Sequence, residues 1–194
     1  MNMKTLILGG LAGLLAGCVS VLPEPDAPEA LYSIDADADF QGLRHDIIVR
    51  EPEAPRLVAG QNLISEGPDG GLRVVPGVEW SGSATRQMQL AMVNSFRTGE
   101  AGHAVLPELG VLAGFELATQ LSVLRLRGDT GVCEMTVSVL STRDRSLLAR
   151  IEIASREQAS SSSASARALA LKAAAMGCIS GASQFAIQTL DEVS

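Results

Sequence analysis

Cys18 is the residue whose position predicts the clearest chemistry in this chain of 194 residues. It follows a segment that holds one cation, Lys4, and then a short apolar run that ends at Gly17. A positive start, a short apolar run and small residues before a cleavage point are typical of a secretory signal peptide. A transmembrane helix would need about twenty apolar residues, and polar sequence already begins at Ser20. We therefore expect residues 1–17 to be a signal peptide.

The last residues of this segment, Leu15-Ala16-Gly17-Cys18, resemble the lipobox of bacterial lipoproteins. In a lipobox the Cys thiol takes a diacylglyceryl group, the signal peptide is cut before the Cys, and the new amine is acylated. The resemblance implies that Cys18 is the lipid-attachment site and the first residue of the mature chain. One acyl chain anchors a protein only marginally, whereas several hold it on a membrane almost permanently. An ordinary signal peptide with a chance Cys, or a short buried helix, is the alternative.

The mature chain, residues 18–194, is acidic and long enough for one domain with a sizeable core. Removal of residues 1–17 takes away one basic residue, so 14 basic and 22 acidic residues remain and the net charge moves from −7 to −8. An acidic surface disfavours nucleic acid and anionic lipid headgroups as partners. Residues 18–30 are rich in Pro and acidic residues, which predicts a tether between the lipid and a domain at residues 31–194.

Cys133 and Cys178 are an even pair in a chain expected to be exported, which predicts a disulfide. Cys133 opens an alternating run and lies on the same predicted strand face as Val137. Cys178 lies in an Ala-rich helical segment, in register with Ala174 and Ala182. Both thiols therefore point into one strand–helix interface, although two buried free thiols remain the alternative. A disulfide that closes a loop of about 45 residues would stabilise the fold by at most about 4 kcal/mol in the chain-entropy model.

The apolar patterning predicts an α/β (α+β) fold: a single mixed, largely antiparallel sheet of about five strands with two helices packed on it. Residues 31–59 are expected to form one or two edge strands interrupted by prolines. The other expected strands are residues 61–65, 72–75, 105–106, 115–127, 132–142 and 147–158, and the expected helices are residues 83–98 and 164–190. In the first long strand Leu124 falls out of register with Leu121, so a bulge, or burial of both faces, is expected near Val123.

Residues with catalytic potential are few in this sequence, and their spacing predicts no active site. His45 and His103 have no Cys or His at metal-ligand spacing. The glycine-rich residues 67–71 lack the Lys-Ser/Thr of a phosphate loop, and the alternating aspartates in residues 35–39 lack the Gly and Glu of a calcium loop. No Gly-x-Ser-x-Gly motif occurs. We therefore expect no catalytic residues, no metal and no cofactor.

The mature sequence also resembles a known family. The carrying features are the segment Val49–Leu57 with its two prolines, the apolar pair Leu63-Ile64, Trp80 before an amphipathic helix, and the long strands followed by an Ala-rich helix. In this order they resemble the ABC-type transport auxiliary lipoproteins. These are the small lipoproteins that accompany paraquat-inducible-type and other MCE (mammalian-cell-entry) lipid transporters. The resemblance covers residues 31–190.

The resemblance implies a non-catalytic partner of an MCE-domain protein and of an ABC transporter permease and ATPase, acting in phospholipid movement across the periplasm. Val19 stands where an Asp would mark inner-membrane retention in enteric bacteria, so we expect lipid anchoring at the periplasmic face of the outer membrane. A homo-oligomer is possible. Trp80 is a candidate for partner binding, with core packing as the alternative. A structural or assembly lipoprotein, similar in layout to the lipopolysaccharide-assembly plug or to secretin pilots, is a rival reading, as is a lipid-binding carrier.

Overall fold

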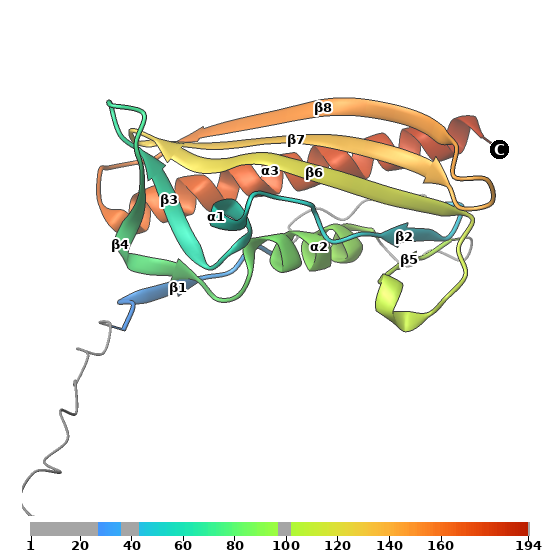
Figure 1. The fold of residues 1–194 in the computed structure, drawn as a ribbon, viewed down its shortest axis with the longest axis horizontal. Helices are drawn as coiled ribbons and strands as arrows, with labels where there is room; N and C mark the ends of the chain where they lie inside the picture. The colour runs from blue at the N-terminus through green and yellow to red at the C-terminus, as the bar shows by residue number, and fades with distance from the viewer. Residues whose placement is uncertain (1–26, 36–42, 97–101, 194) are drawn as a thin grey trace, which may run out of the picture.

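The computed structural model describes residues 27–35, 43–96 and 102–193. The signal peptide, Cys18 and most of the predicted tether lie outside these residues. Within them, the chain forms one mixed β-sheet with its helices packed into a common core (Figure 1). The strands are β1 (Ala30–Tyr32), β2 (Ile47–Val49), β3 (Asn62–Glu66), β4 (Leu72–Trp80), β5 (Ala104–Val105), β6 (Phe115–Arg127), β7 (Thr130–Ser141) and β8 (Leu147–Gln158). The helices are α1 (Arg56–Ala59), α2 (Ala84–Ser95), the 3₁₀ turn η1 (Pro107–Leu109) and α3 (Ala164–Glu192).

The sheet is built around β6. On one side β6, β7 and β8 form the predicted antiparallel meander. On the other side, β2 pairs in parallel with the start of β6 and β3 pairs in parallel with its end. β4 and β1 continue outward from β3, and β5 continues from β2. The long pairings are therefore antiparallel, as expected, while the short pairings beside β6 are mostly parallel.

The prediction of about five strands was wrong, because the described residues form an eight-stranded sheet. Three of these strands are short: β1 and β2 have three residues each and β5 has two. A strand of two or three residues shows no readable alternation, and only its position beside a longer strand makes it part of the sheet.

The prediction of two helices was also wrong, because the described residues contain a third α-helix, the four-residue α1. Its single turn follows Pro55, whose carbonyl accepts hydrogen bonds from Val58 N (2.8 Å) and Ala59 N (3.0 Å). Proline is well suited to the start of a helix, but one turn is too short to show helical periodicity. The sequence reading placed edge strands in this segment.

Each of the two long helices is preceded by a capping serine. Ser83 caps α2 by accepting a hydrogen bond from Arg86 N, and Ser163 caps α3 by accepting one from Ala166 N at 3.2 Å. These serine oxygens satisfy N–H groups that the first helical turn leaves without partners. Residues 160–163, four serines in a row, therefore form the loop before α3 and its cap.

The core lies between the sheet and the α2–α3 pair. α3 packs mainly on β7 and β8, and α2 packs on α3 and on the β2–β5 end of the sheet. Small residues let α3 approach closely: a Cβ built on Gly131 of β7 would come within 2.5–2.6 Å of backbone atoms of Ala170 and Leu171. The predicted bulge in β6 is confirmed, since its register with β7 shifts between Leu121 and Val123. No helix among the described residues is long and apolar enough to cross a bilayer.

Candidate functional site

Cys133 and Cys178 meet in the interface predicted for them. The structure joins Cys133 of β7 to Cys178 of α3 by a disulfide, with their Cα atoms 6.4 Å apart. Both residues are fully buried in the core. Because the bond ties the central meander to the last helix, its role in this fold is structural. Its formation in the exported protein stays a prediction.

Trp80, the predicted candidate for partner binding, lies in the core at the end of β4. Its side chain is 1% exposed, and its backbone N–H donates to Gln61 O at 2.7 Å. This position suits the packing alternative, because a partner could touch the indole only if Trp80 left the core. Partner binding by Trp80 stays a prediction.

The two histidines lie near each other in the chain's surface loops but form no metal site. His103 Nδ1 lies 3.1 Å from Asp46 Oδ1, and the same carboxylate oxygen accepts the His103 backbone N–H at 2.9 Å. His45 is half-buried, with its ring edge against Phe115 at a centroid distance of 5.3 Å, so it is less solvated than expected. Among the described residues no three His, Cys, Asp or Glu side chains are grouped as metal ligands.

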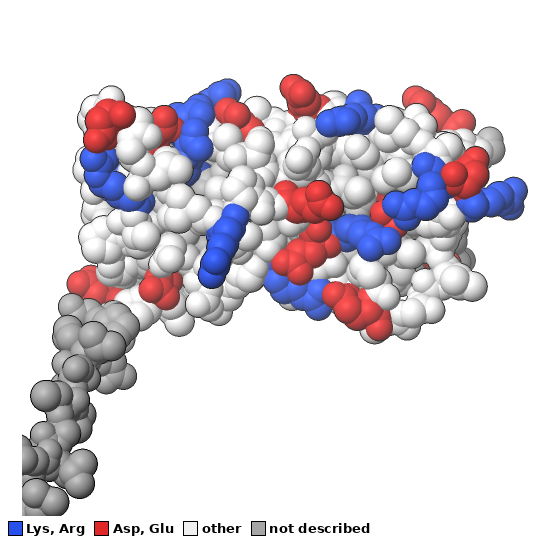
Figure 2. All heavy atoms as spheres, in the orientation of Figure 1, with Lys and Arg blue, Asp and Glu red and all other residues white. Residues whose placement is uncertain are grey.

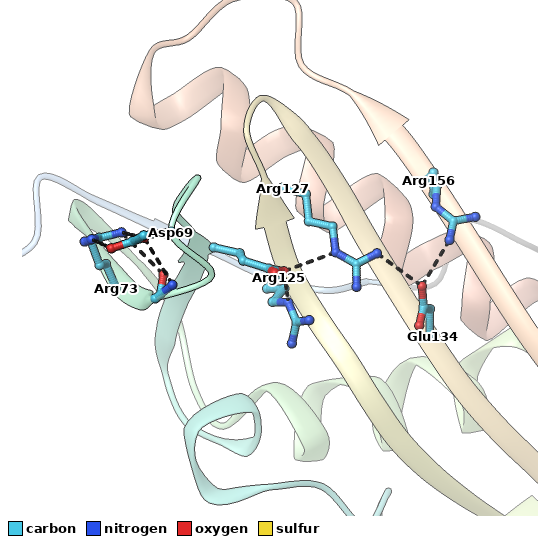
Figure 3. A network of polar contacts seen from close by, with 8 residues as sticks. Asp69, Arg73, Arg125, Arg127, Glu134 and Arg156 are labelled. Atoms are coloured by element: carbon cyan, nitrogen blue, oxygen red, sulfur yellow. Dashed lines mark hydrogen bonds and ion pairs between the residues drawn. The ribbon is translucent and has the colours of Figure 1, made fainter.

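The outer face of the sheet carries a network of ion pairs that ties together four strands (Figure 3). Glu66 of β3 accepts hydrogen bonds from Arg125 Nε (2.8 Å) and Arg127 Nε (3.2 Å) of β6. Glu134 of β7 then lies 3.6 Å from Arg127 Nη1 and 3.1 Å from Arg156 Nη2 of β8. Hydrogen bonds from Arg127 and Arg125 lower the pKa of Glu66 below its ordinary value. The network fixes side chains on this face and leaves no reactive group in it.

A shallow polar hollow lies further along the same face. Glu116 of β6 is 6% exposed and accepts a hydrogen bond from Arg50 Nη2 at 2.8 Å. This hydrogen bond to Glu116 raises the pKa of Arg50. Gln120, Arg145 and Arg150 are among the other residues that line the hollow. Acidic and basic groups alternate over the visible face of the molecule, so no large patch of one sign is presented there to a nucleic acid (Figure 2).

An apolar loop between η1 and β6 is the surface feature that sequence reasoning missed. Leu109, Val111 and Leu112 are 65%, 45% and 95% exposed. Gly110 between them has a φ of 66°, a left-handed conformation that glycine adopts without strain. Neighbouring exposed apolar side chains are typical of contact surfaces in soluble proteins. We call residues 109–112 the apolar loop. Its sequence is too short and irregular to separate from an ordinary turn.

The comparison with family models decides the classification. The model of the ABC-type transport auxiliary lipoprotein component matches residues 30–177, which span β1 to most of α3. The chain belongs to this family. A search of curated protein sequences found no match.

Solved structures with the same fold accompany this family assignment. Protein XCC0632 from Xanthomonas campestris, of family DUF330, is 16% identical, with a TM-score of 0.72 over 85% of this chain and 95% of that chain. An uncharacterized protein is 11% identical, with a TM-score of 0.59 over 87% of this chain and 100% of that chain. The hypothetical protein CT253 from Chlamydia trachomatis is 8% identical, with a TM-score of 0.50 over 75% and 98%. At these identities the likeness establishes the fold alone.

Proposed function

We propose that this protein is a lipid-anchored, non-catalytic component of an MCE-type ABC transporter that moves phospholipids between the inner and outer membranes. The observation that carries the proposal is the family match over residues 30–177, which makes the chain an auxiliary lipoprotein of ABC-type transport. Cys18 supplies the anchor, and Val19 after it supports delivery to the periplasmic face of the outer membrane.

In this role the protein works by contact. The tether holds the folded domain near one membrane, so the local concentration of the domain toward a partner that spans the periplasm is high and modest affinity suffices. The apolar loop is the proposed contact with the MCE-domain protein, because burial of Leu109 and Leu112 against a partner would remove exposed apolar surface from water. The permease and ATPase are then reached through the MCE-domain protein.

The contact is tested by co-purification. An MCE-domain protein of the native organism is tagged and isolated in detergent from cells that express this chain as wild type or as Leu112→Asp. We expect the wild type to co-purify with the tagged protein. Recovery of the Leu112→Asp variant should fall at least tenfold, because the new carboxylate would have to be buried in the contact. Leu169→Asp is the matched control, since Leu169 is also exposed but lies on α3, away from the apolar loop. Equal recovery of all three chains would remove the apolar loop from the proposal.

Lipid attachment at Cys18 is tested in a separate experiment, whose result does not depend on whether the MCE-domain protein binds. Labelled palmitate should enter the wild-type chain and not Cys18→Ser, since the thiol is the proposed attachment atom. Fractionation of the labelled chain with outer-membrane markers is the expected location. Equal labelling of both chains would contradict the role of Cys18, and recovery with inner-membrane markers would contradict the location.

A further inference from the structure

β8 is an unprotected edge of the sheet. Among the described residues it pairs only with β7, and its twelve residues run along the top of the molecule in Figure 1. A long edge strand presents a row of unpaired backbone N–H and C=O groups, which proteins commonly protect with Pro, with charged side chains, especially Lys, or with a covering element. β8 contains neither Pro nor Lys, and its charges are those of Arg150, Glu152, Arg156 and Glu157. Ile151, at the middle of the strand, is 41% exposed.

The backbone groups that β8 leaves free follow from its pairing with β7. Ala159 N donates to Asp129 O at 2.8 Å, which makes this pair a hydrogen-bonded one. Hydrogen-bonded pairs alternate with non-bonded pairs in an antiparallel ladder, so the odd-numbered residues 149–159 turn their backbone groups toward β7. The even-numbered residues Arg150, Glu152 and Ala154 therefore turn theirs outward, away from the sheet.

The side chains along this free edge carry two charges without ion-pair partners. Arg150 and Glu152 both lie on the outer face, opposite Ser138 and Thr136 of β7, and in the described part of the chain neither forms an ion pair. Most of the other charged side chains on the outer face of the sheet form ion pairs, as in the network that runs from Glu66 to Arg156. Ile151 lies between them on the inner face, opposite the buried Val137.

We infer that a second copy of this chain pairs its β8 with this edge in antiparallel orientation, with Ile151 opposite Ile151 on a two-fold axis. In this register Arg150 of each copy lies opposite Glu152 of the other, which gives two opposite-charge pairs. Arg150 and Glu152 are also the residues whose backbone groups are free, so the same pairs are hydrogen-bonded. On the inner face Ile151 meets Ile151, and Ala149 meets Ile153.

Neighbouring registers are disfavoured by charge. A two-fold axis at Arg150 would place Arg150 of one copy opposite Arg150 of the other, and an axis at Glu152 would do the same with Glu152. An axis at Ile153 would place Arg150 opposite Arg156. An axis at Ala154 pairs Glu152 with Arg156, but Arg156 is already bound to Glu134, and Ile151 would face Glu157. Like charges directly opposite each other destabilise a strand pair. Only the axis at Ile151 satisfies both the charges and the apolar side chains.

This dimer goes beyond the proposed function and does not depend on the transporter assignment. It is isologous, because the same edge is used on both copies, and it joins two sheets into one. A single strand pair is a modest interface. Tethering of both copies to one membrane surface raises their effective concentration and favours the pairing.

The register is tested by cross-linking of the exported full-length chain in intact cells. Ile151→Cys places two thiols opposite each other at the axis and is expected to give a disulfide-linked dimer on a non-reducing gel. Ala154→Cys is the matched control: it lies on the same exposed edge, but in this register it faces Leu148 and stays far from its own copy. Wild type controls for the native cysteines. A dimer of Ala154→Cys, or none of Ile151→Cys, would overturn the register.

That the partner is a second copy of this chain is tested with charge-reversal variants. Dimerisation of the detergent-solubilised full chain is measured by analytical ultracentrifugation. Arg150→Glu and Glu152→Arg should each weaken the dimer by at least about tenfold, because two attractive pairs become repulsive. A one-to-one mixture of the two variants should dimerise again, and so should the double exchange in one chain. A folding defect cannot produce this recovery. A monomeric wild type would overturn the proposal, as would dimers that survive both single variants.

Discussion

At the scale of single residues, burial decides what Trp80 does. The indole is 1% exposed within the main core, where truncation of a large side chain typically costs about 3–5 kcal/mol. We therefore expect Trp80→Ala to lower the free energy of unfolding by about that amount, measured by urea denaturation followed by far-UV circular dichroism. The wild-type fluorescence should be blue-shifted and protected from iodide. A solvent-like emission from the folded wild type would instead support the partner-binding role.

The pairing of Glu66 with two arginines makes a prediction about pH. Its pKa is lowered in the folded protein from an ordinary value of 4.5, first by Arg127 and then by Arg125. A carboxylate with a lowered folded pKa adds stability above its unfolded pKa and loses it as the pH falls through the folded pKa. Glu66→Gln should therefore be less stable than wild type at neutral pH, and the difference should shrink below about pH 4.5. The measurement is the urea midpoint of both chains from pH 7 to 3.

This experiment needs a control variant that removes a carboxylate outside the Glu66 network. Glu157→Gln is a suitable one, since Glu157 is an exposed residue of β8. It should follow the wild-type pH profile. If Glu66→Gln kept the same difference from wild type at every pH, the ion pairs would not be the source of its effect.

At the scale of the elements, the close approach of β7 to α3 depends on Gly131. A Cβ at this position would meet backbone atoms of Ala170 and Leu171, which cannot move away as a flexible side chain would. Overpacking of this kind typically costs about 1–3 kcal/mol, so Gly131→Ala should lower the unfolding free energy by that amount. Gly114→Ala is the matched control, because nothing lies within 4 Å of its Cβ. Equal stability of the two variants would contradict the packing described for α3.

The elements also show how far the sequence determines this fold. The strands Phe115–Arg127 and Leu147–Gln158 and the start of α3 were predicted because long alternating or helical patterns carry their own signal. α1 was not predicted, and the short strands β1, β2 and β5 were placed only loosely, as edge strands within residues 31–59 and a strand at residues 105–106. Two to four residues become a strand or a turn only through their neighbours. The Glu66–Arg125 pair was missed for a related reason: it joins β3 to β6, and only the register of that pairing brings the two side chains together.

At the scale of the whole molecule, the fold agrees with a contact function. The helices and the inner face of the sheet share one core, while the outer face holds ion pairs and the apolar loop remains exposed. The disulfide adds a covalent tie between β7 and α3. In the proposed function, such a domain is held by a lipid at one membrane and acts through the surfaces that it presents to its partners.

The most direct test of this account is genetic epistasis in the native organism, read as sensitivity of the outer-membrane barrier to detergent. Deletion of the gene should weaken the barrier as much as deletion of the MCE-domain gene does, and the double deletion should add nothing, because both proteins serve one transporter. A chain that carries both His45→Ala and His103→Ala, expressed in the deletion strain, should restore the barrier fully. An additive double deletion would place the protein outside that transporter, and loss of function by a stably folded double His variant would contradict the non-catalytic role.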